Sequence, residues 1–340
     1  TGHFIARRNV GTVGGANHHI RPAGDDIIGG TCGWISTCLV CLLFNFASRS
    51  FVVRDMRYMG HNRDMTNSSN FHGLEAFGLD LHFAATGRGS GFSGAAWRGL
   101  MGQALFRTVC SFPAPACATC PALGACAYPN LFKPLSEAAL PPFWLHGWQR
   151  GRAGWTIGVR WLGAGNVFAV GEWLAALASG NADLLFGGSP ARLEHATSPT
   201  TGVLWRRGTG WLAMPVALAL TDGAPPPACR VRFIAPLVSK HVGDPLSGAL
   251  HTRLQRLVQQ HGDGTDLPRP TPPWHCRVLT QRTLRIPLAR RMLAGTEWDL
   301  ELRDIDADAW RMLCAGRELH AGGQAGIGCG QYDILPVGDA

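Results

Sequence analysis

The same order of elements, a strand followed by an amphipathic helix, occurs in both halves of this 340-residue chain. In the first half, Leu79, Leu81 and Phe83 alternate with polar or small residues, a period that predicts a strand. A glycine-rich turn follows, and residues 95–109 are expected to form a helix. In the second half, residues 230–234 are strand-like and precede a leucine-rich segment. The repeated order predicts an α+β protein with two successive units.

The leucine-rich segment is the clearest helix of the second half. Its leucines are spaced four, four and three residues apart, so they share one helical face: Leu246, Leu250, Leu254 and Leu257. Further strands are expected at 155–162, 201–206, 211–219, 276–285, 297–303 and 331–335, and further helices at 170–178 and 306–314. Residues 187–190, with two glycines and a proline, are expected to form a loop.

Proline marks the boundary between the two units. Pro225, Pro226 and Pro227 are stiff and lack the amide donors that a central strand needs. We therefore expect a first domain over 76–224 and a second over 225–340. Residues 1–75 lack regular periodicity, so we assign them no function. They are interpreted as a genuine extension, a fusion fragment or translated upstream sequence that is not native, and we favour the last.

Composition indicates a folded protein with an anionic partner. Apolar residues make up 46% of the chain and charged residues 16%, which excludes a disordered chain. The net charge is +8, and Lys133 and Lys240 are the only lysines, so 29 of the 31 basic residues are arginine. Arginine suits phosphate recognition, although a high-GC genome also favours it. The apolar stretch 34–47 is shorter than a membrane-spanning helix, so we expect a cytoplasmic protein without a membrane partner.

Four cysteines lie in one short loop behind the helix expected at 95–109. Their spacing is Cys-x6-Cys-x2-Cys-x5-Cys, and they are Cys110, Cys117, Cys120 and Cys126. Four soft ligands in 17 residues are sufficient for a tetrahedral structural zinc site. The alternatives are an iron–sulfur cluster, buried thiols without metal, or a disulfide. Because four thiolates leave no open coordination position, we expect no catalytic role for a zinc ion here.

The C-terminal region contains a glycine-rich segment with five glycines in nine residues: Gly322, Gly323, Gly326, Gly328 and Gly330. Such a segment brings backbone amides close to a ligand and can hold phosphate groups. A dinucleotide fingerprint would follow a strand and open a helix, whereas here a helix precedes and a strand follows. The pattern therefore excludes a Rossmann or P-loop site and leaves a phosphate-binding loop or a tight turn.

Four ordered stretches resemble one protein family. They are Trp97–Arg107 with the cysteines behind it, Pro141–Trp144 leading to Val159–Gly163, Arg232–Lys240 before the leucine helix, and the glycine-rich Leu319–Ile334. Over residues 76–337 the chain resembles the RAMP superfamily of CRISPR proteins, and within it the repeat-processing (Cas6-like) endoribonucleases. The resemblance implies two tandem ferredoxin-like (RRM-like) folds, with the cysteine loop as an insertion in the first and the glycine-rich loop at the end of the second.

The resemblance also implies an activity. Members of this family cleave CRISPR repeat RNA without a metal or other cofactor, by attack of a 2′-hydroxyl on the adjacent phosphate, and often keep the mature crRNA bound. This chemistry needs a general base, a general acid and cationic stabilisation of the phosphorane. Many relatives place a histidine on the first helix, but this sequence has none between Gly94 and Cys110. The absence leaves open an arginine-driven mechanism or loss of cleavage with RNA binding retained.

Candidate residues follow from these expectations. His146, which we expect in a loop, and the neighbouring Lys240 and His241 are the candidate catalytic residues. Between Leu267 and Thr296 the chain has no acidic residue, and its arginines predict a phosphate-binding stripe. With Arg88 and Arg98 near the first turn, the candidate RNA-binding arginines are Arg88, Arg98, Arg277, Arg282, Arg285, Arg290 and Arg291, together with the five glycines.

Three functions are compared. The favoured one is an endoribonuclease that matures CRISPR RNA. The second is a non-catalytic RNA-binding RAMP subunit of a CRISPR effector complex, which predicts binding to repeat RNA without cleavage. The third is a zinc-stabilised regulator, which predicts a preference for duplex DNA.

Overall fold

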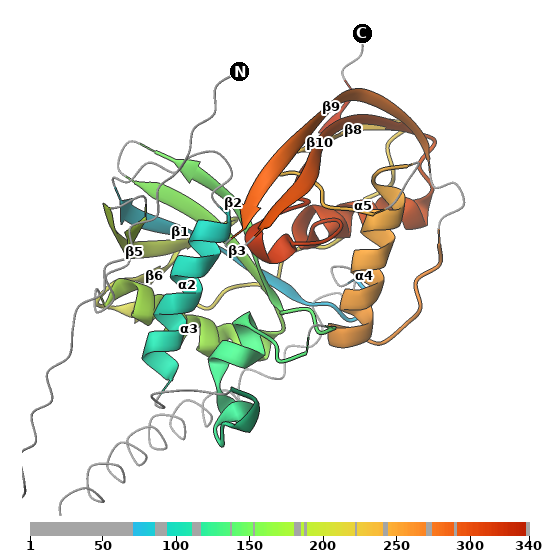
Figure 1. Ribbon diagram of the computed structural model, residues 1–340. Coiled ribbons are helices and arrows are strands. Elements are labelled where there is room, and N and C mark those ends of the chain that lie inside the picture. The colour runs from blue at the N-terminus through green and yellow to red at the C-terminus, as the bar shows by residue number, and fades with distance from the viewer. Residues whose placement is uncertain are drawn as a thin grey trace, which may run out of the picture. The chain divides into compact units, whose positions relative to one another are not determined.

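The computed structural model describes residues 71–85, 94–110, 117–136, 138–151, 154–179, 185–186, 189–221, 223–240, 244–269, 274–288 and 291–337. These residues belong to one compact unit, Thr66–Ala340. They form two lobes, each built on an antiparallel sheet (Figure 1). The interpretation of 1–75 as an extension lies outside the described residues except at 71–75. There Phe71 and Leu74 are buried, so the folded chain begins before residue 76.

The first lobe follows the order strand, helix, two strands, helix, strand. Its elements are β1 (Ala76–Ala85), α2 (Gly94–Val109), β2 (Phe143–Arg150), β3 (Trp155–Leu162), α3 (Val167–Ala178) and β5 (Ser189–Ser198). The strands lie in the order β5, β1, β3, β2, with the last strand of the unit beside the first, as in a ferredoxin-like fold. Beyond β5 the sheet continues with β6 (Gly202–Arg206) and β7 (Gly210–Trp211), and β4 (Leu185–Phe186) also pairs with β5.

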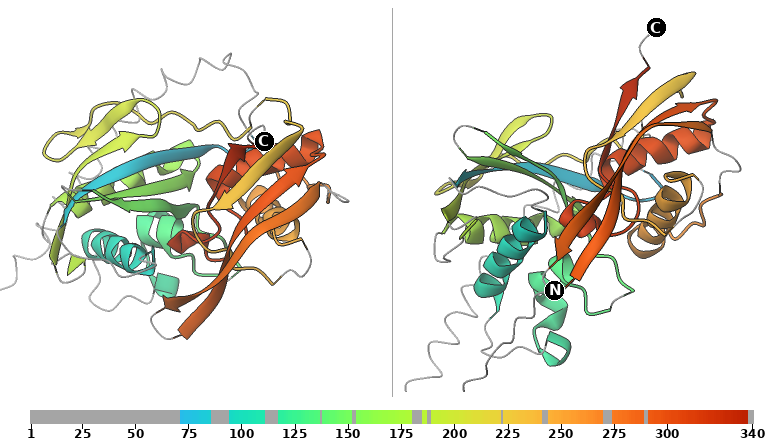
Figure 2. Two further views of the ribbon diagram at one scale, coloured as in Figure 1. Left: turned by 90° about the horizontal axis from the view of Figure 1, so that it is seen from above. Right: turned by 45° about the horizontal axis from the view of Figure 1, so that its top comes forward.

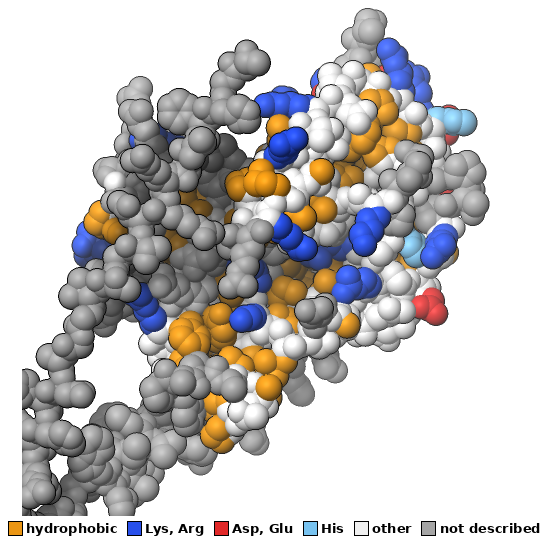
Figure 3. All heavy atoms as spheres, viewed as in Figure 1, with side chains coloured by type: hydrophobic (Ala, Val, Ile, Leu, Met, Phe, Trp, Pro, Cys, Tyr) orange, Lys and Arg blue, Asp and Glu red, His pale blue; other side chains and the backbone are white. Residues whose placement is uncertain are grey.

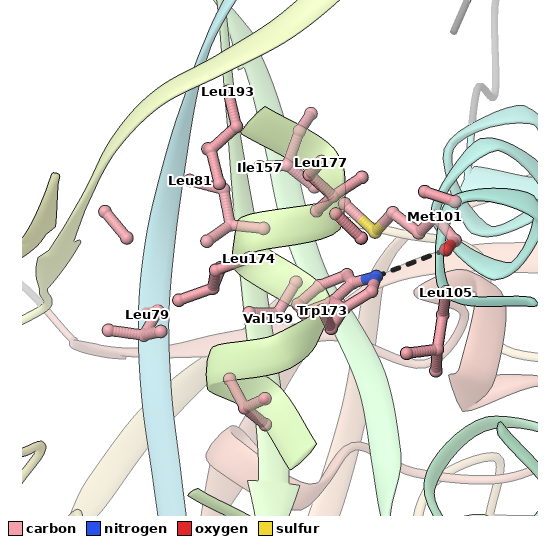
Figure 4. Packing of buried hydrophobic residues seen from close by; sticks show 14 of the residues in the cluster. Leu79, Leu81, Met101, Leu105, Ile157, Val159, Trp173, Leu174, Leu177 and Leu193 are labelled. Atoms are coloured by element: carbon pink, nitrogen blue, oxygen red, sulfur yellow. Dashed lines mark hydrogen bonds between the residues drawn. The ribbon is translucent and has the colours of Figure 1, made fainter. Parts of the chain in front are cut away.

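The core of the first lobe lies between this sheet and the helices α2 and α3 (Figure 4). Leu79 and Leu81 are fully buried because alternate residues of β1 face the helices. On α3, the indole Nε1 of Trp173 donates a hydrogen bond to the Met101 carbonyl of α2, at 3.2 Å. This buried bond joins the two helices that cover the sheet.

The second lobe has the same topology. Its elements are β8 (Ala228–Phe233), α4 (Ser247–His261), β9 (His275–Leu288), β10 (Arg291–Arg303), α5 (Ala307–Leu319) and β11 (Tyr332–Pro336). The strand order β11, β8, β10, β9 repeats that of the first lobe, and β9 lies at the edge of the sheet (Figure 2). The tandem ferredoxin-like fold expected from the sequence is therefore present. Among the helices that the structure describes, none combines the length and the apolar run that crossing a membrane requires.

The two lobes share an interlobe seam, which we define by the contacts of β2 and β3 with the end of α5. Trp144 of β2 is fully buried in the core of the second lobe, and its Nε1 donates to the Glu318 carbonyl at 3.0 Å. Arg160 of β3 donates from Nε to Glu318 Oε2, also at 3.0 Å. The seam therefore contains a buried arginine–carboxylate pair as well as apolar contacts.

Several expected elements differ from those observed. β2 occupies 143–150, where His146 was expected in a loop, and β5 occupies 189–198, where the sequence predicted a loop at 187–190 and no strand. Each contains a bulge or register shift that interrupts the two-residue period. The strand expected at 211–219 is reduced to Trp211, because the described chain leaves the sheet there. β10 begins at Arg291 rather than 297, because its first residues pair with β9 alone. The other expected helices and strands are confirmed to within a few residues.

The start of α5 gives a stability prediction. The carboxylate of Asp306 accepts a hydrogen bond from the Ala309 amide at 2.7 Å, an N-cap. Asp306→Ala is expected to lower the free energy of unfolding by about 1 kcal/mol, because it leaves this amide without its partner. Asp306→Ser should retain most of the stability, since serine also caps. Urea denaturation of the three proteins checks this, and equal loss in both variants would contradict a capping role.

Candidate nucleic-acid interface

The glycine-rich loop, residues 320–330, has a backbone that requires glycine at defined positions. Gly322, Gly328 and Gly330 have φ of 68°, 87° and 74°. A Cβ at Gly330 would lie 1.8 Å from the Ala321 carbonyl oxygen. The amides of Gly322, Gly323 and Gly330 donate to the carbonyls of Ala249, Val238 and Pro236. These glycines therefore allow close packing against β8 and α4, and their amides are used within the fold.

Arg98 holds the glycine-rich loop to α2. Its guanidinium donates to the Gly326 carbonyl at 3.1 Å and to the Phe132 carbonyl at 2.6 Å, and it lies 4.3 Å from the centre of the Phe132 ring. Burial lowers the pKa of Arg98 to about 10, so it remains charged at neutral pH. The predicted phosphate ligand thus has a structural role, and two of its donors are already satisfied.

The arginine-rich region forms a long β-hairpin of β9 and β10. We call residues 281–297 the hairpin arm, because this part lies beyond the last pairing of β10 with β8 at Asp299. Arg282 and Arg285 are exposed on β9, and Arg291 is exposed at the start of β10. In Figure 3, Lys and Arg side chains predominate over Asp and Glu on the face shown.

The prediction of a basic stripe without acidic partners is wrong at Arg277 and Arg282. Antiparallel pairing places Glu297 opposite Arg282 and Glu301 opposite Arg277, at 4.0 and 3.8 Å. These partners could not be recognised from the sequence, because both glutamates lie outside the acid-free stretch between Leu267 and Thr296. The side chains of Arg277 and Arg282 remain 75% exposed. Ion pairs of this length between exposed side chains are weak. Arg285 pairs in register with Ala294 and carries no such partner across the strand.

The hairpin arm rests on the glycine-rich loop. Ile286 of the arm is fully buried in a small apolar cluster with Ile327 and Cys329 of the loop, and Ala95 of α2 packs against it. Gly295, also in the arm, leaves room for the Ile286 side chain, because a Cβ there would lie 2.8 Å from it. Three segments far apart in the sequence, α2, the arm and the loop, therefore meet at one place.

A cavity of about 490 Å³ opens beside the loop, between α4 and the end of β8. Gly322, Gly323 and Gln324 form one wall. Its cationic lining comes from Lys240 and from Arg253 and Arg256 of α4. Arg253 Nε donates to the Leu319 carbonyl at 2.8 Å, and burial followed by the charge of Arg256 lowers its pKa to about 10. The cavity thus presents three cations next to the glycine-rich loop.

A second, more open hollow lies where the loop meets α2. It is lined by Arg98, Gln103, Tyr128, Lys133 and Ile327 and measures about 720 Å³. The glycine-rich loop therefore separates two hollows, with Gly322–Gln324 on one and Ile327 on the other. A nucleic-acid strand that crossed the loop would meet cations in both hollows, and it would meet the hairpin arm where the arm packs on the loop.

We expected His146 in a loop, but it lies in strand β2, within the interlobe seam. Its side chain is 14% exposed, its Nδ1 lies 3.1 Å from Nε2 of His320, and its Nε2 lies 3.9 Å from Glu318. Burial, followed by the charge of Arg160, holds the pKa of His146 well below its ordinary value. Burial likewise lowers the pKa of His320 to about 3. Both histidines are therefore neutral, and they face each other rather than a cavity.

The other predicted site residues divide into two groups. Lys240 is exposed at the rim of the cavity. His241, Arg88 and Arg290 lie outside the described residues, so their roles stay predictions. The four cysteines line a small cavity behind α2, which shares Phe106 and Tyr128 with the open hollow. Trp274, just before β9, is buried, and its Nε1 donates to Asp244 at 2.7 Å.

Sequence reasoning missed Arg253, Arg256, Gln324 and Lys133. The two arginines lie on the leucine helix, where charged residues between leucines are typical of a solvated face. Their position on the face toward the glycine-rich loop could be found only from the packing of α4. Lys133, seven residues after the last cysteine of the loop, offered no periodic signal.

Comparisons with known proteins give one family model and several solved structures. Residues 74–149 match the model AF_1859_N, described as an N-terminal domain. A Cas6 product complex is 18% identical with a TM-score of 0.48, over 78% of this chain and 100% of that chain. Thermus thermophilus Cas6 is 15% identical with a TM-score of 0.47, over 77% and 99%. A RAMP protein described as binding different RNA substrates is 9% identical with a TM-score of 0.44, over 76% and 100%.

No curated protein matches the sequence significantly. Within the chain itself, both lobes have the ferredoxin-like strand order. The chain is therefore built of two tandem ferredoxin-like folds.

Proposed function

We propose that this chain binds CRISPR repeat RNA across the glycine-rich loop, cleaves it without a metal and retains the product. The observation that carries the proposal is the convergence of the hairpin arm, the loop and the cavity lined by Lys240, Arg253 and Arg256. Cations on several sides of a groove suit a phosphate backbone, because each contact releases condensed counterions.

For the chemistry, the proposal uses Lys240 and His241. Lys240 is exposed at the rim of the cavity, where its ammonium would stabilise the phosphorane. His241, the next residue in the sequence, is proposed as the general base for the 2′-hydroxyl. As the 2′-oxygen bonds to phosphorus, the bond between phosphorus and the 5′-oxygen breaks. The 5′-oxygen takes a proton from water, His241 holds the proton of the 2′-hydroxyl, and the upstream product carries a 2′,3′-cyclic phosphate.

The test is incubation of the full chain with repeat RNA from its own locus in EDTA. Site-specific cleavage with a cyclic-phosphate end is expected. Lys240→Ala should slow single-turnover cleavage by about 100-fold, the lower range for removing one group that stabilises charge in the transition state. Arg192→Ala is the control, because it removes an exposed cation of β5 that lines neither the cavity nor the open hollow. Equal rates in both variants, or cleavage that requires added metal, would contradict the mechanism.

A second function is a non-catalytic RNA-binding subunit of a CRISPR effector complex. The burial of His146 and His320 favours it, because neither histidine lies open to a substrate. The same assay separates the two functions. Tight binding of repeat RNA without cleavage supports the subunit, whereas cleavage supports the enzyme.

A further inference from the structure

Four thiols surround one small cavity in the loop between α2 and β2. This four-cysteine loop contains η1 (Cys117–Thr119), η2 (Leu123–Ala125) and the π-helix η3 (Tyr128–Phe132). The cavity measures about 40 Å³, and its wall includes Cys110, Cys117, Cys120 and Cys126. It lies behind α2 and borders the open hollow, with which it shares Phe106 and Tyr128. The proposed RNA chemistry gives these thiols no role.

The segment around these thiols has little apolar core of its own. Neither η1 nor η2 contains a buried residue. The described residues from 117 to 126 are all half-buried or exposed. Short segments that cannot bury enough apolar surface usually need a metal or a covalent crosslink to hold one conformation.

We propose that the four-cysteine loop binds one zinc ion through four thiolates. In the described residues, no three potential ligands already stand as a coordination shell, so binding requires side-chain rotation around the shared cavity. The four thiols line one shared cavity, and four cysteine thiolates complete the tetrahedral shell of a structural zinc ion. Binding releases four protons from four thiols, and it involves no oxidation.

The zinc ion would act on the interface through the segment after Cys126. That segment leads into η3, and at its end Phe132 provides the carbonyl and the ring that hold Arg98. Phe132 also packs closely on α2, since a Cβ at Gly102 would lie 2.5 Å from its ring. The metal is therefore a structural support for one wall of the open hollow, outside the reacting groups.

The test is metal analysis of the full chain purified without chelator. One zinc per chain is expected, lost in Cys117→Ser and retained in Cys276→Ser, which removes a half-buried thiol of β9. Because Cys117→Ser could misfold, the wild-type protein is also reconstituted with Co²⁺ after zinc removal. The absorption of a tetrahedral tetrathiolate cobalt site should appear and disappear again on zinc addition.

Three results would overturn the proposal. They are reduced thiols without stoichiometric metal, iron with acid-labile sulfide, and a disulfide within the loop. Cobalt absorption that is unchanged in Cys117→Ser would place the metal elsewhere and overturn it equally.

Discussion

Lowering the pH from about 7 to about 5 is expected to destabilise the fold strongly, because two histidines of the interlobe seam are held neutral. Burial, then Arg253 and Arg160, lower the pKa of His320 to about 3, although a hydrogen bond to the Cys329 carbonyl opposes them. Burial, then Arg160, His320 and Arg317, lower the pKa of His146. Glu318 also faces His146, at 3.9 Å.

The direction in which stability changes with pH follows from proton linkage. In the unfolded chain each histidine has a pKa of about 6.5, so below that pH the unfolded state binds a proton that the folded state does not. Both contributions are fully present above about pH 6.5 and are lost as the pH falls toward the folded pKa. For His320 the loss is about 1.4 kcal/mol per pH unit, or about 2 kcal/mol at about pH 5, and His146 adds to it in the same direction.

Urea denaturation between about pH 8 and about pH 5 measures this effect. His146→Gln and His320→Asn should each reduce the slope of stability against pH, because neither amide titrates. His275→Gln is the matched control, since that side chain is 81% exposed. An unchanged slope in the double variant of His146 and His320 would show that other groups cause the acid sensitivity.

The sequence predicted most elements of the fold because their hydrophobic periods are regular. β3 begins and ends where the alternation of 155–162 predicts, and α2 differs by one residue from the expected 95–109. β2 and β5 were missed because bulges interrupt their period. His146 was therefore placed in a loop, and its burial against His320 could not be foreseen across 174 residues.

The sequence predicted which residue types form the candidate site, but it predicted less well where they point and which partners they have. The arginines of the hairpin arm lie on an exposed edge strand, as an acid-free basic stretch suggests. Arg98 instead turns inward to the glycine-rich loop, and the glutamates opposite Arg277 and Arg282 come from strand pairing. Local sequence patterns carry no information on such partners, because the pairs form only when distant elements pack.

The central claim, that RNA lies along the hairpin arm and the glycine-rich loop, predicts a large effect of removing charge from the arm. The test variant combines Arg282→Gln, Arg285→Gln and Arg291→Gln, which leaves the backbone register unchanged. If each arginine contacts one phosphate of single-stranded RNA, affinity for repeat RNA should fall about 50-fold near 0.15 M salt. The slope of log affinity against log salt should become shallower by about 2.

The matched control is the triple variant Arg192→Gln, Arg206→Gln and Arg207→Gln, which removes the same charge from exposed positions on or beside β5 and β6. The deciding measurement is the salt dependence of repeat-RNA binding by the native chain and both variants, with duplex DNA as the competitor. The account predicts a weaker and less salt-dependent interaction for the arm variant alone, and preference for RNA throughout. Equal loss in the two variants, or stronger binding to duplex DNA, would contradict it.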